Sequence, residues 1–199
     1  MQNDRLEQQL EFILELDKLK NVIRQNYINH GERRENTAEH SWQVALQAVV
    51  LAEYANEEVD ILRVVKMLLI HDVVEILAGD TYIYDAQMRE EQEDKEREAA
   101  ETLFGMLPAP QSEELKALWF EFEGRKTADS RFAKSMDRLL PMLQNVRSKG
   151  KSWTEHGVTK EMVLENALNI RPGSEALYTY AVDLIQRAAQ EGIFQSKTR

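Results

Sequence analysis

The sequence predicts an all-α fold, and three observations support this prediction. Apolar residues recur at three- and four-residue spacing along almost the whole chain, which is the period of an amphipathic helix. The 199 residues include only 8 glycines and 4 prolines, so positions that break helices are few. No segment shows the strict alternation of a convincing strand. We therefore expect a single domain, spanning residues 1–199, built from roughly eight helices.

The first two expected helices flank a polar loop. A helix over residues 4–20 carries leucine and isoleucine side chains along one side. After the loop, Asn36 or Thr37 can cap a helix over residues 37–55, because a side-chain oxygen there accepts hydrogen bonds from the first backbone N–H groups. This arrangement puts His40 in the first turn of the second helix.

The third expected helix covers residues 61–77 and is strongly hydrophobic. Asp60 can cap its start, and Gly79 is expected to end it by taking a left-handed conformation. The remaining periodic segments predict five more helices, over residues 86–106, 112–123, 128–149, 160–170 and 174–190.

Composition excludes several classes of function. The chain contains no cysteine, which rules out disulfides, thiolate zinc sites and cysteine nucleophiles and favours a cytoplasmic location. No apolar run approaches the roughly 20 residues that cross a bilayer, so we expect no membrane association. The formal net charge of −10 repels nucleic-acid phosphates, and the densest charge run, residues 89–101, mixes both signs. A nucleic-acid polymer is therefore not an expected partner.

Three ionisable side chains interrupt the apolar stretch LLIHDVVEIL at residues 68–77. His71, Asp72 and Glu75 would project over neighbouring parts of one helix surface, and buried charges of this kind must be paired, hydrogen-bonded or bound to a metal. Imidazole and carboxylate groups suit Mg²⁺, Mn²⁺, Fe²⁺, Co²⁺ or Zn²⁺. Taken alone, however, an adjacent His-Asp pair is more often a paired buried histidine than a metal site.

Two further motifs strengthen the metal hypothesis. The segment RRENTAEHS at residues 33–41 contains His40, and FAKSMDRL at residues 132–139 contains Asp137. The ordered set of His40, the His-Asp pair and Asp137, with separations of 31 and 65 residues, resembles the metal-dependent phosphohydrolases of the HD-domain superfamily. Two segments resemble sequences from the branch of bacterial 5′-deoxynucleotidases and their eukaryotic HD-domain-containing relatives: LLIHDVVEILAGD and LWFEFEGRKTADSRFAKSMDRL.

This resemblance covers about residues 16–147, on which the helices over residues 160–190 are expected to pack. It implies a helical HD domain in which His40, His71, Asp72 and Asp137 bind one divalent metal ion, with Mn, Co, Mg, Fe and Zn all compatible with such ligands. The other two histidines of the chain are expected to lie elsewhere, one in a loop and one at a turn or helix cap: His30 and His156.

The resemblance also implies two catalytic carboxylates, Glu75 and Asp80. Hydrolysis of a phosphate ester needs one group to take a proton from the attacking water and another to assist the leaving oxygen. The sequence does not assign the two roles. Read without the resemblance, Asp80 is equally well explained as a turn residue after Gly79.

Three residues near the first motif are candidates for binding substrate. Arg24 stands where the deoxynucleotidase branch has an arginine that contacts phosphate, and a forked cation suits that role. Gln25 replaces the tryptophan that follows this arginine in the branch, so selectivity for deoxyribose is open, and Tyr27 offers an alternative aromatic wall. Arg33 is a second candidate cation, although a surface location explains it as well.

We therefore expect a metal-dependent phosphohydrolase that converts (deoxy)nucleoside 5′-monophosphates to nucleoside and phosphate. Two alternatives remain open at this stage. One is hydrolysis of another small phosphate ester or phosphodiester, and the other is a non-catalytic regulatory protein that keeps the HD fold. The family resemblance, together with methionine and aromatic residues on helices such as residues 115–120, also implies a homodimer.

Overall fold

The computed structural model describes residues 2–84 and 89–194 of the protein, and it confirms the predicted all-α fold class. Ten α-helices lie in the described residues: α1 (Gln2–Glu15), α2 (Thr37–Leu51), α3 (Ile61–Ile70), α4 (Glu75–Ala78), α5 (Arg89–Phe104), α6 (Ala109–Gly124), α7 (Ala128–Arg147), α8 (Lys151–Glu155), α9 (Lys160–Ala167) and α10 (Glu175–Gln190). Short 3-10 helices follow α1 and α2 and join the strands: η1 (Leu16–Asn21), η2 (Asn29–Gly31) and η3 (Ala52–Tyr54).

The predicted helix starts at Asn36 and Asp60 are confirmed. The Asn36 side chain accepts a hydrogen bond from the Glu39 N–H at 2.9 Å, and the Glu39 carboxylate accepts one from the Asn36 N–H at 3.3 Å. The Asp60 carboxylate accepts from the Arg63 N–H at 3.1 Å. These bonds satisfy N–H groups that have no partner inside the helix. The expected helix over residues 86–106 is observed as α5 from Arg89, and its predicted first residues lie outside the described part of the chain.

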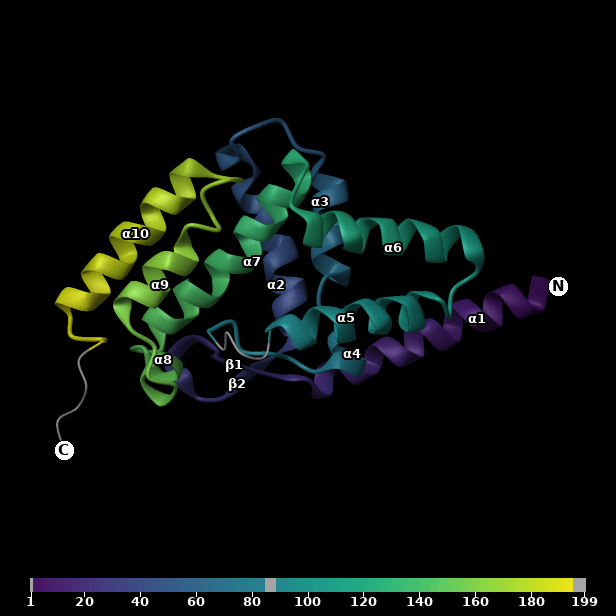
Figure 1. Ribbon diagram of the computed structural model, residues 1–199, viewed down its shortest axis with the longest axis horizontal. Coiled ribbons are helices and arrows are strands. Elements are labelled where there is room, and N and C mark those ends of the chain that lie inside the picture. Colours follow the sequence, from purple (N-terminus) through teal and green to yellow (C-terminus); the bar gives the residue numbers. More distant parts are fainter. Residues whose placement is uncertain (1, 85–88, 195–199) are drawn as a thin grey trace.

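The expectation of no strand was wrong. Strands β1 (Ile23–Tyr27) and β2 (Arg34–Asn36) form a two-stranded antiparallel hairpin in the segment that we expected to be a polar loop. Both strands are short and mostly polar, so their alternation is too brief to stand out in the sequence. The hairpin leads directly into α2, as Figure 1 shows.

The expected continuous helix over residues 61–77 is divided into α3 and α4. Between them the backbone tightens, because the N–H groups of Val73, Glu75 and Ile76 each bond the carbonyl three residues earlier. Gly79 ends α4 with a positive φ of 79°, but its ψ of 158° is extended rather than left-handed helical. The turn therefore directs the side chains of the His-Asp motif differently from a continuous helix.

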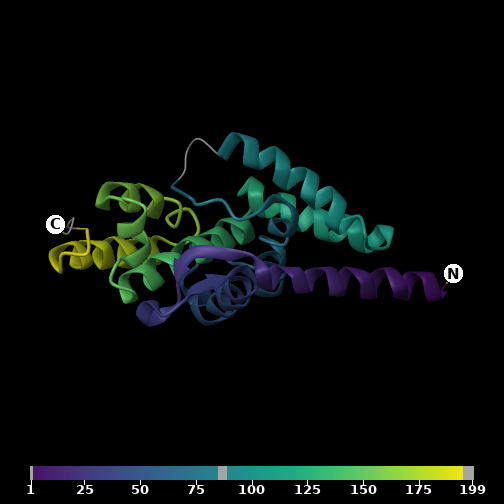
Figure 2. The same ribbon diagram turned by 90° about the horizontal axis from the view of Figure 1, so that it is seen from below.

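Helix α7 lies at the centre of the molecule (Figure 1). One hydrophobic cluster joins it to α2, α3, α9 and α10, and a second cluster joins α1, α5, α6 and the segment around α4. Figures 1 and 2 show α1 and α10 at opposite ends of the molecule. Within the described residues, no helix combines the length and the hydrophobicity that crossing a membrane requires.

Candidate metal centre and cleft

Four side chains from distant parts of the chain meet beside α7. His40 comes from α2, His71 and Asp72 from the turn after α3, and Asp137 from α7. His40 Nε2 lies 3.2 Å from Asp137 Oδ1, and His71 Nε2 lies 3.1 Å from Asp72 Oδ2 and 3.6 Å from Asp137 Oδ1. Ligand atoms of His40, His71 and Asp72 all fall within 4.8 Å of one another. The fold thus brings the four predicted ligands together.

The two imidazole rings turn the same nitrogen, Nε2, towards this cluster. His71 Nδ1 lies 2.8 Å from the Leu68 carbonyl oxygen, which accepts a hydrogen bond from it and leaves the lone pair on Nε2. His71 Nε2 itself is buried and has no hydrogen-bond partner. A metal ion would take the place of a proton on this nitrogen, so its buried position between two carboxylates fits a metal ligand.

Glu35, which was not predicted, lies beside the corresponding ring nitrogen of His40. Its Oε2 lies 3.3 Å from His40 Nδ1, outside hydrogen-bond geometry, and its Oε1 accepts a hydrogen bond from Gln144 Nε2 at 2.5 Å. Glu35 is 1% exposed although it stands in a polar stretch of sequence. Its burial depends on α7, which is far away along the chain, so the local sequence carries no signal for it.

The charges of the cluster favour a cation at its centre. Burial tends to lower the pKa of His71, but Asp72 and Asp137 outweigh it and raise that pKa to about 10. Burial tends to raise the pKa of Asp137, yet Arg138 and Lys134 hold it well below the usual range. The cluster therefore attracts positive charge, which a divalent ion bound by neutral imidazoles would supply.

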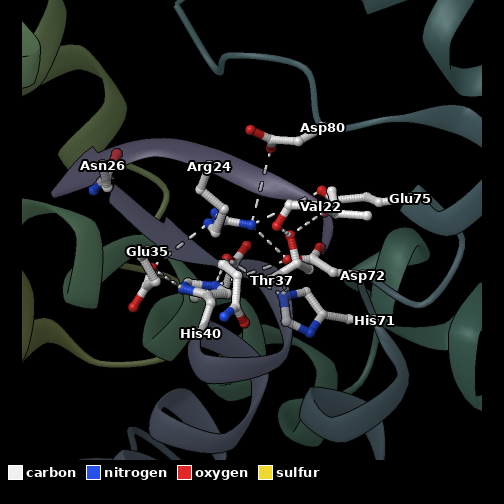
Figure 3. Close-up of polar contacts among 12 residues, drawn as sticks. Val22, Arg24, Asn26, Glu35, Thr37, His40, His71, Asp72, Glu75 and Asp80 are labelled. Carbon is white, nitrogen blue, oxygen red and sulfur yellow. Dashed lines mark hydrogen bonds and ion pairs between the residues drawn. The ribbon is translucent and has the colours of Figure 1, made fainter. Parts of the chain in front are cut away.

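Glu75 and Asp80, the two predicted catalytic carboxylates, lie next to the cluster (Figure 3). Burial and the charge of Asp72 raise the pKa of Glu75 well above its ordinary value, and Thr37 Oγ1 donates a hydrogen bond to Glu75 Oε2 at 2.9 Å. Burial also raises the pKa of Asp80, against the opposing charge of Arg24. A raised pKa favours the protonated form of a carboxyl group, which is the form that can donate a proton.

Arg24, on β1, connects these carboxylates. Its Nη1 donates a hydrogen bond to Asp72 Oδ2 at 2.7 Å and lies 3.8 Å from Glu75 Oε1 and 4.0 Å from Asp80 Oδ1. Its Nε lies 3.7 Å from Glu35 Oε2. Burial alone would lower the pKa of Arg24, but the carboxylates raise it, so the guanidinium stays charged. Figure 3 shows this side chain at the centre of the acidic groups.

A cleft of about 260 Å³ opens over the cluster. Its wall near the cluster includes Arg24, His71, Asp72 and Asp137. Gln25 also lines the cleft, and its Oε1 accepts hydrogen bonds from Arg34 Nη1 at 2.6 Å and His156 Nε2 at 3.1 Å. Since arginine can only donate, these bonds fix the amide orientation and leave its NH₂ group for another partner.

The structure does not bring Arg33 to the cleft. Its guanidinium pairs with both carboxylate oxygens of Glu39 at 2.8 Å, and 56% of its side chain is exposed. Arg33, just before β2, is therefore a surface residue that is paired with Glu39. Its position does not support the prediction that it binds substrate.

Aromatic residues do line the cleft, but Tyr27 is not among them. The Tyr27 hydroxyl donates to the Glu155 carboxylate at 2.9 Å, while Tyr82 and Tyr84 form part of the cleft wall. The ring of His156 lies 4.5 Å from that of Tyr82, and His156 caps the end of α8, as a turn or capping residue should. Tyr82 and Tyr84 follow Asp80 in a segment without regular structure, so no periodic pattern indicated their direction.

Comparisons with known proteins show the family to which the chain is related. The sequence profile of the HD domain family matches residues 16–178. The 5′-deoxynucleotidase HDDC2 of Bos taurus is 31% identical over 137 residues and that of Homo sapiens is 29% identical over 136; each alignment covers 68% of this chain. This chain spans 65% of the length of these two relatives.

A solved structure is similar over nearly the whole chain. It is the crystal structure of a predicted metal-dependent phosphohydrolase from Magnetospirillum magnetotacticum MS-1, with 48% sequence identity, a TM-score of 0.93 and 97% of both chains covered. The family profile covers most of the chain and includes all four predicted ligands. On these findings, the chain belongs to the HD domain family.

Proposed function

We propose that this protein is a metal-dependent phosphohydrolase that cleaves (deoxy)nucleoside 5′-monophosphates to nucleoside and phosphate. The observation that carries the proposal is the meeting of His40, His71, Asp72 and Asp137 beneath a cleft that also exposes Glu75 and Asp80. The 5′-deoxynucleotidases among its relatives support the substrate class.

The four clustered residues would hold one divalent ion. Two imidazoles and two carboxylates form a donor set that suits such an ion, and the unpartnered Nε2 of His71 fits a ligand atom. When bound, a divalent ion withdraws charge from phosphoryl oxygens and makes water more acidic. Mn, Co, Mg, Fe and Zn are each compatible with these donors.

Glu75 and Asp80 would handle the two protons of the reaction. Water attacks phosphorus, a new P–O bond forms, and the bond to the 5′ oxygen breaks. One carboxylate takes a proton from the attacking water and the other gives a proton to the leaving oxygen. The raised pKa values of Glu75 and Asp80 suit either residue to donate, so the division of roles follows from where the substrate lies.

Arg24 and Gln25 would contact the substrate from β1. Arg24 lines the cleft beside Asp72, where its charge can offset that of a phosphate. The amide NH₂ of Gln25, oriented by Arg34 and His156, is a donor that a sugar hydroxyl can accept. We therefore propose weaker exclusion of ribonucleotides here than an apolar tryptophan at this position would give.

Phosphate release from a panel of nucleoside monophosphates tests the proposal. We expect release with added Mn²⁺, Co²⁺ or Mg²⁺ and none after chelation. Release from phosphodiesters alone would indicate the alternative substrate class. A metal-bound protein that releases phosphate from no compound in the panel would be a non-catalytic HD-fold protein, which would contradict the proposal.

The ligand assignment has a separate test in the metal content of purified variants. His71→Ala and Asp137→Asn are each expected to abolish activity and to lower metal occupancy, because each removes one of the four ligands and leaves the others buried without compensation. Full occupancy in both variants would show that these residues do not bind the ion.

We also propose that the whole chain is one HD domain, that it works in the cytoplasm and that it forms a homodimer. The family match reaches α10, which shares a hydrophobic cluster with α7, and this supports the single domain. The absence of cysteine supports a reducing compartment. The dimer is supported by an apolar stripe on α2 formed by exposed side chains at helical spacing: Trp42, Leu46, Val49 and Val50.

A further inference from the structure

Arg138 follows Asp137 on α7 and lines the cleft. Its Nε atom is buried and has no hydrogen-bond partner, and 20% of its side chain is exposed. Asp137 Oδ2 lies 3.7 Å from this nitrogen, which is too far for a hydrogen bond. Because a guanidinium keeps its proton and carries five N–H donors, a buried position without an acceptor is unfavourable unless a ligand supplies one.

Arg24 differs from Arg138 because its guanidinium already has carboxylate partners within the protein. Its Nη1 already donates to Asp72 at 2.7 Å, and three more carboxylates lie within 4.0 Å of its nitrogens. The charge of Arg24 is therefore shared among four acidic groups of the protein. A phosphate approaching Arg24 would meet those same carboxylates, and their repulsion weakens its binding there.

Lys134, one turn before Arg138, is also committed to protein groups. Its Nζ lies 3.3 Å from Glu123 Oε1 and 3.4 Å from Asp137 Oδ2, and it stands 4.1 Å from the centroid of the Phe122 ring. By contrast, within residues 2–84 and 89–194, the one carboxylate at ion-pair distance from Arg138 is that of Asp137. Of these three cations, Arg138 keeps the most capacity to accept a further anion.

Arg138 lies next to the cluster of His40, His71 and Asp137. Asp137 Oδ2 faces Arg138, while its other oxygen, Oδ1, lies 3.2 Å from His40 Nε2 and 3.6 Å from His71 Nε2. One carboxylate thus separates the guanidinium from the two imidazoles. A group held by Arg138 in the cleft lies beside the residues that would hold the metal.

We propose that Arg138 binds the phosphate group of the substrate, with its Nε–H and a neighbouring Nη–H donating to phosphoryl oxygens. This inference rests on the proposed function and names the residue that holds the anion. A phosphate monoester is negatively charged, so its approach to Asp72 and Asp137 requires a cation with free donors, and a guanidinium presents two of them in parallel. A neutral sugar or base would not need that charge.

Binding of inorganic phosphate to the Mn²⁺-loaded protein, measured by titration calorimetry, tests the inference without relying on turnover. We expect Arg138→Met to weaken phosphate binding by about tenfold to a hundredfold, because a charge-assisted pair of hydrogen bonds is lost. Arg138→Lys keeps the charge but loses the two parallel N–H donors, so its phosphate affinity should fall between those of the wild type and Arg138→Met. Manganese content and melting temperature are measured for each variant.

Arg171→Gln is the matched control, because Arg171 is 59% exposed and pairs with Glu175 at a distance from the cleft. Its phosphate affinity should equal that of the wild type. Phosphate affinity that is unchanged in a folded, manganese-loaded Arg138 variant would overturn the inference, as would a wild type that binds no phosphate. If the wild type binds phosphate through Arg138 but hydrolyses no nucleotide, the proposed function fails while the phosphate site stands.

Discussion

At the scale of single residues, the carboxyl groups around Arg24 are the groups that can give or take protons in the proposed reaction. Glu75 is 8% exposed, its pKa is raised by burial and by the charge of Asp72, and Thr37 donates to one of its oxygens at 2.9 Å. A side chain held in this way keeps its position when its charge is removed. A substitution that removes only the charge of Glu75 can therefore separate its role in proton transfer from its role in the structure.

Glu75→Gln is expected to keep the metal and to lower kcat by about 10²- to 10⁴-fold, the usual contribution of a positioned acid or base. The amide retains the size of the carboxyl group and can accept the hydrogen bond from Thr37, but it cannot exchange a proton. Steady-state kinetics and metal analysis of the same sample check this. Glu93→Gln, an exposed residue of the cleft wall, should behave like the wild type. Near-normal turnover in Glu75→Gln would assign Glu75 a structural role.

A second prediction at this scale concerns Gln25 and the preference of the protein between ribose and deoxyribose. Because its amide NH₂ can donate to a 2′-hydroxyl, AMP and dAMP should be cleaved with similar kcat/KM. Gln25→Trp should favour dAMP, since a flat apolar side chain leaves the hydroxyl without a partner. Strong selectivity for dAMP in the wild type, unchanged in the variant, would point instead to another wall of the cleft, such as Tyr82.

Arg24→Ala should differ from Gln25→Trp in its effect on the two substrates. It should lower kcat/KM for AMP and dAMP to a similar degree, because Arg24 pairs with Asp72 and lies close to Glu75, and both substrates depend on these two carboxyl groups alike. An effect of Arg24→Ala on one sugar alone would assign it to sugar recognition. The two substitutions together therefore separate the contacts to phosphate from those to the sugar.

The residues of the site differ in how far the sequence could identify them. His40, His71, Asp72 and Asp137 stand in recognisable motifs, and the fold brings them together. The importance of Glu35 could not be predicted, because its burial depends on contact with Gln144, more than a hundred residues later. The free Nε of Arg138 depends in the same way on which carboxylates the fold brings near it.

At the scale of elements, the turn between α3 and Asp80 was the least predictable part. The stretch LLIHDVVEIL is apolar at a helical period throughout, so nothing in it indicates that α3 ends at Ile70. The break is made by backbone hydrogen bonds to the third residue instead of the fourth. The long helices α5, α6, α7 and α10 were predictable, because each repeats its apolar spacing over 16 residues or more.

Gly79→Ala tests the importance of this turn. At Gly79, φ is 79° and ψ is 158°, a region that residues with a Cβ atom adopt only under strain of about 1 to 3 kcal/mol. We expect a lower melting temperature and, because Asp80 is the next residue, a lower kcat. Gly124→Ala is the matched control, since Gly124 has no positive φ and a Cβ there meets no atom within 4 Å. Equal effects of the two substitutions would contradict a special role for the turn.

At the scale of the whole molecule, α2 carries an exposed apolar stripe that the proposed site does not explain. Trp42 is 62% exposed, Val49 54% and Val50 63%, although α2 also carries the buried His40 on its other side. In the segment 115–120, Trp119 belongs to the core, as is usual for such a residue: it is 4% exposed and donates a hydrogen bond to the His71 carbonyl at 3.0 Å. The dimer proposal therefore concerns α2.

Trp42→Lys combined with Val49→Lys should convert a dimer into a monomer, because two buried charges at an interface are unfavourable. Light scattering coupled to size-exclusion chromatography measures the mass. Leu168→Lys, which places a charge on an apolar residue that is 50% exposed at the end of α9 and not on the α2 stripe, should leave the dimer intact. A wild type that is monomeric at micromolar concentration would contradict the dimer.

The wide separation of the four clustered side chains along the chain has a consequence for the protein during its synthesis. Asp137 is added 65 residues after Asp72, which at about 5 to 20 residues per second takes about 3 to 13 seconds of translation. During that interval the ribosome holds a nascent chain with both imidazoles and one carboxylate but without α7, on which the cluster closes. Under the proposed ligand assignment, the site with all four ligands can therefore form only after α7 has emerged from the exit tunnel.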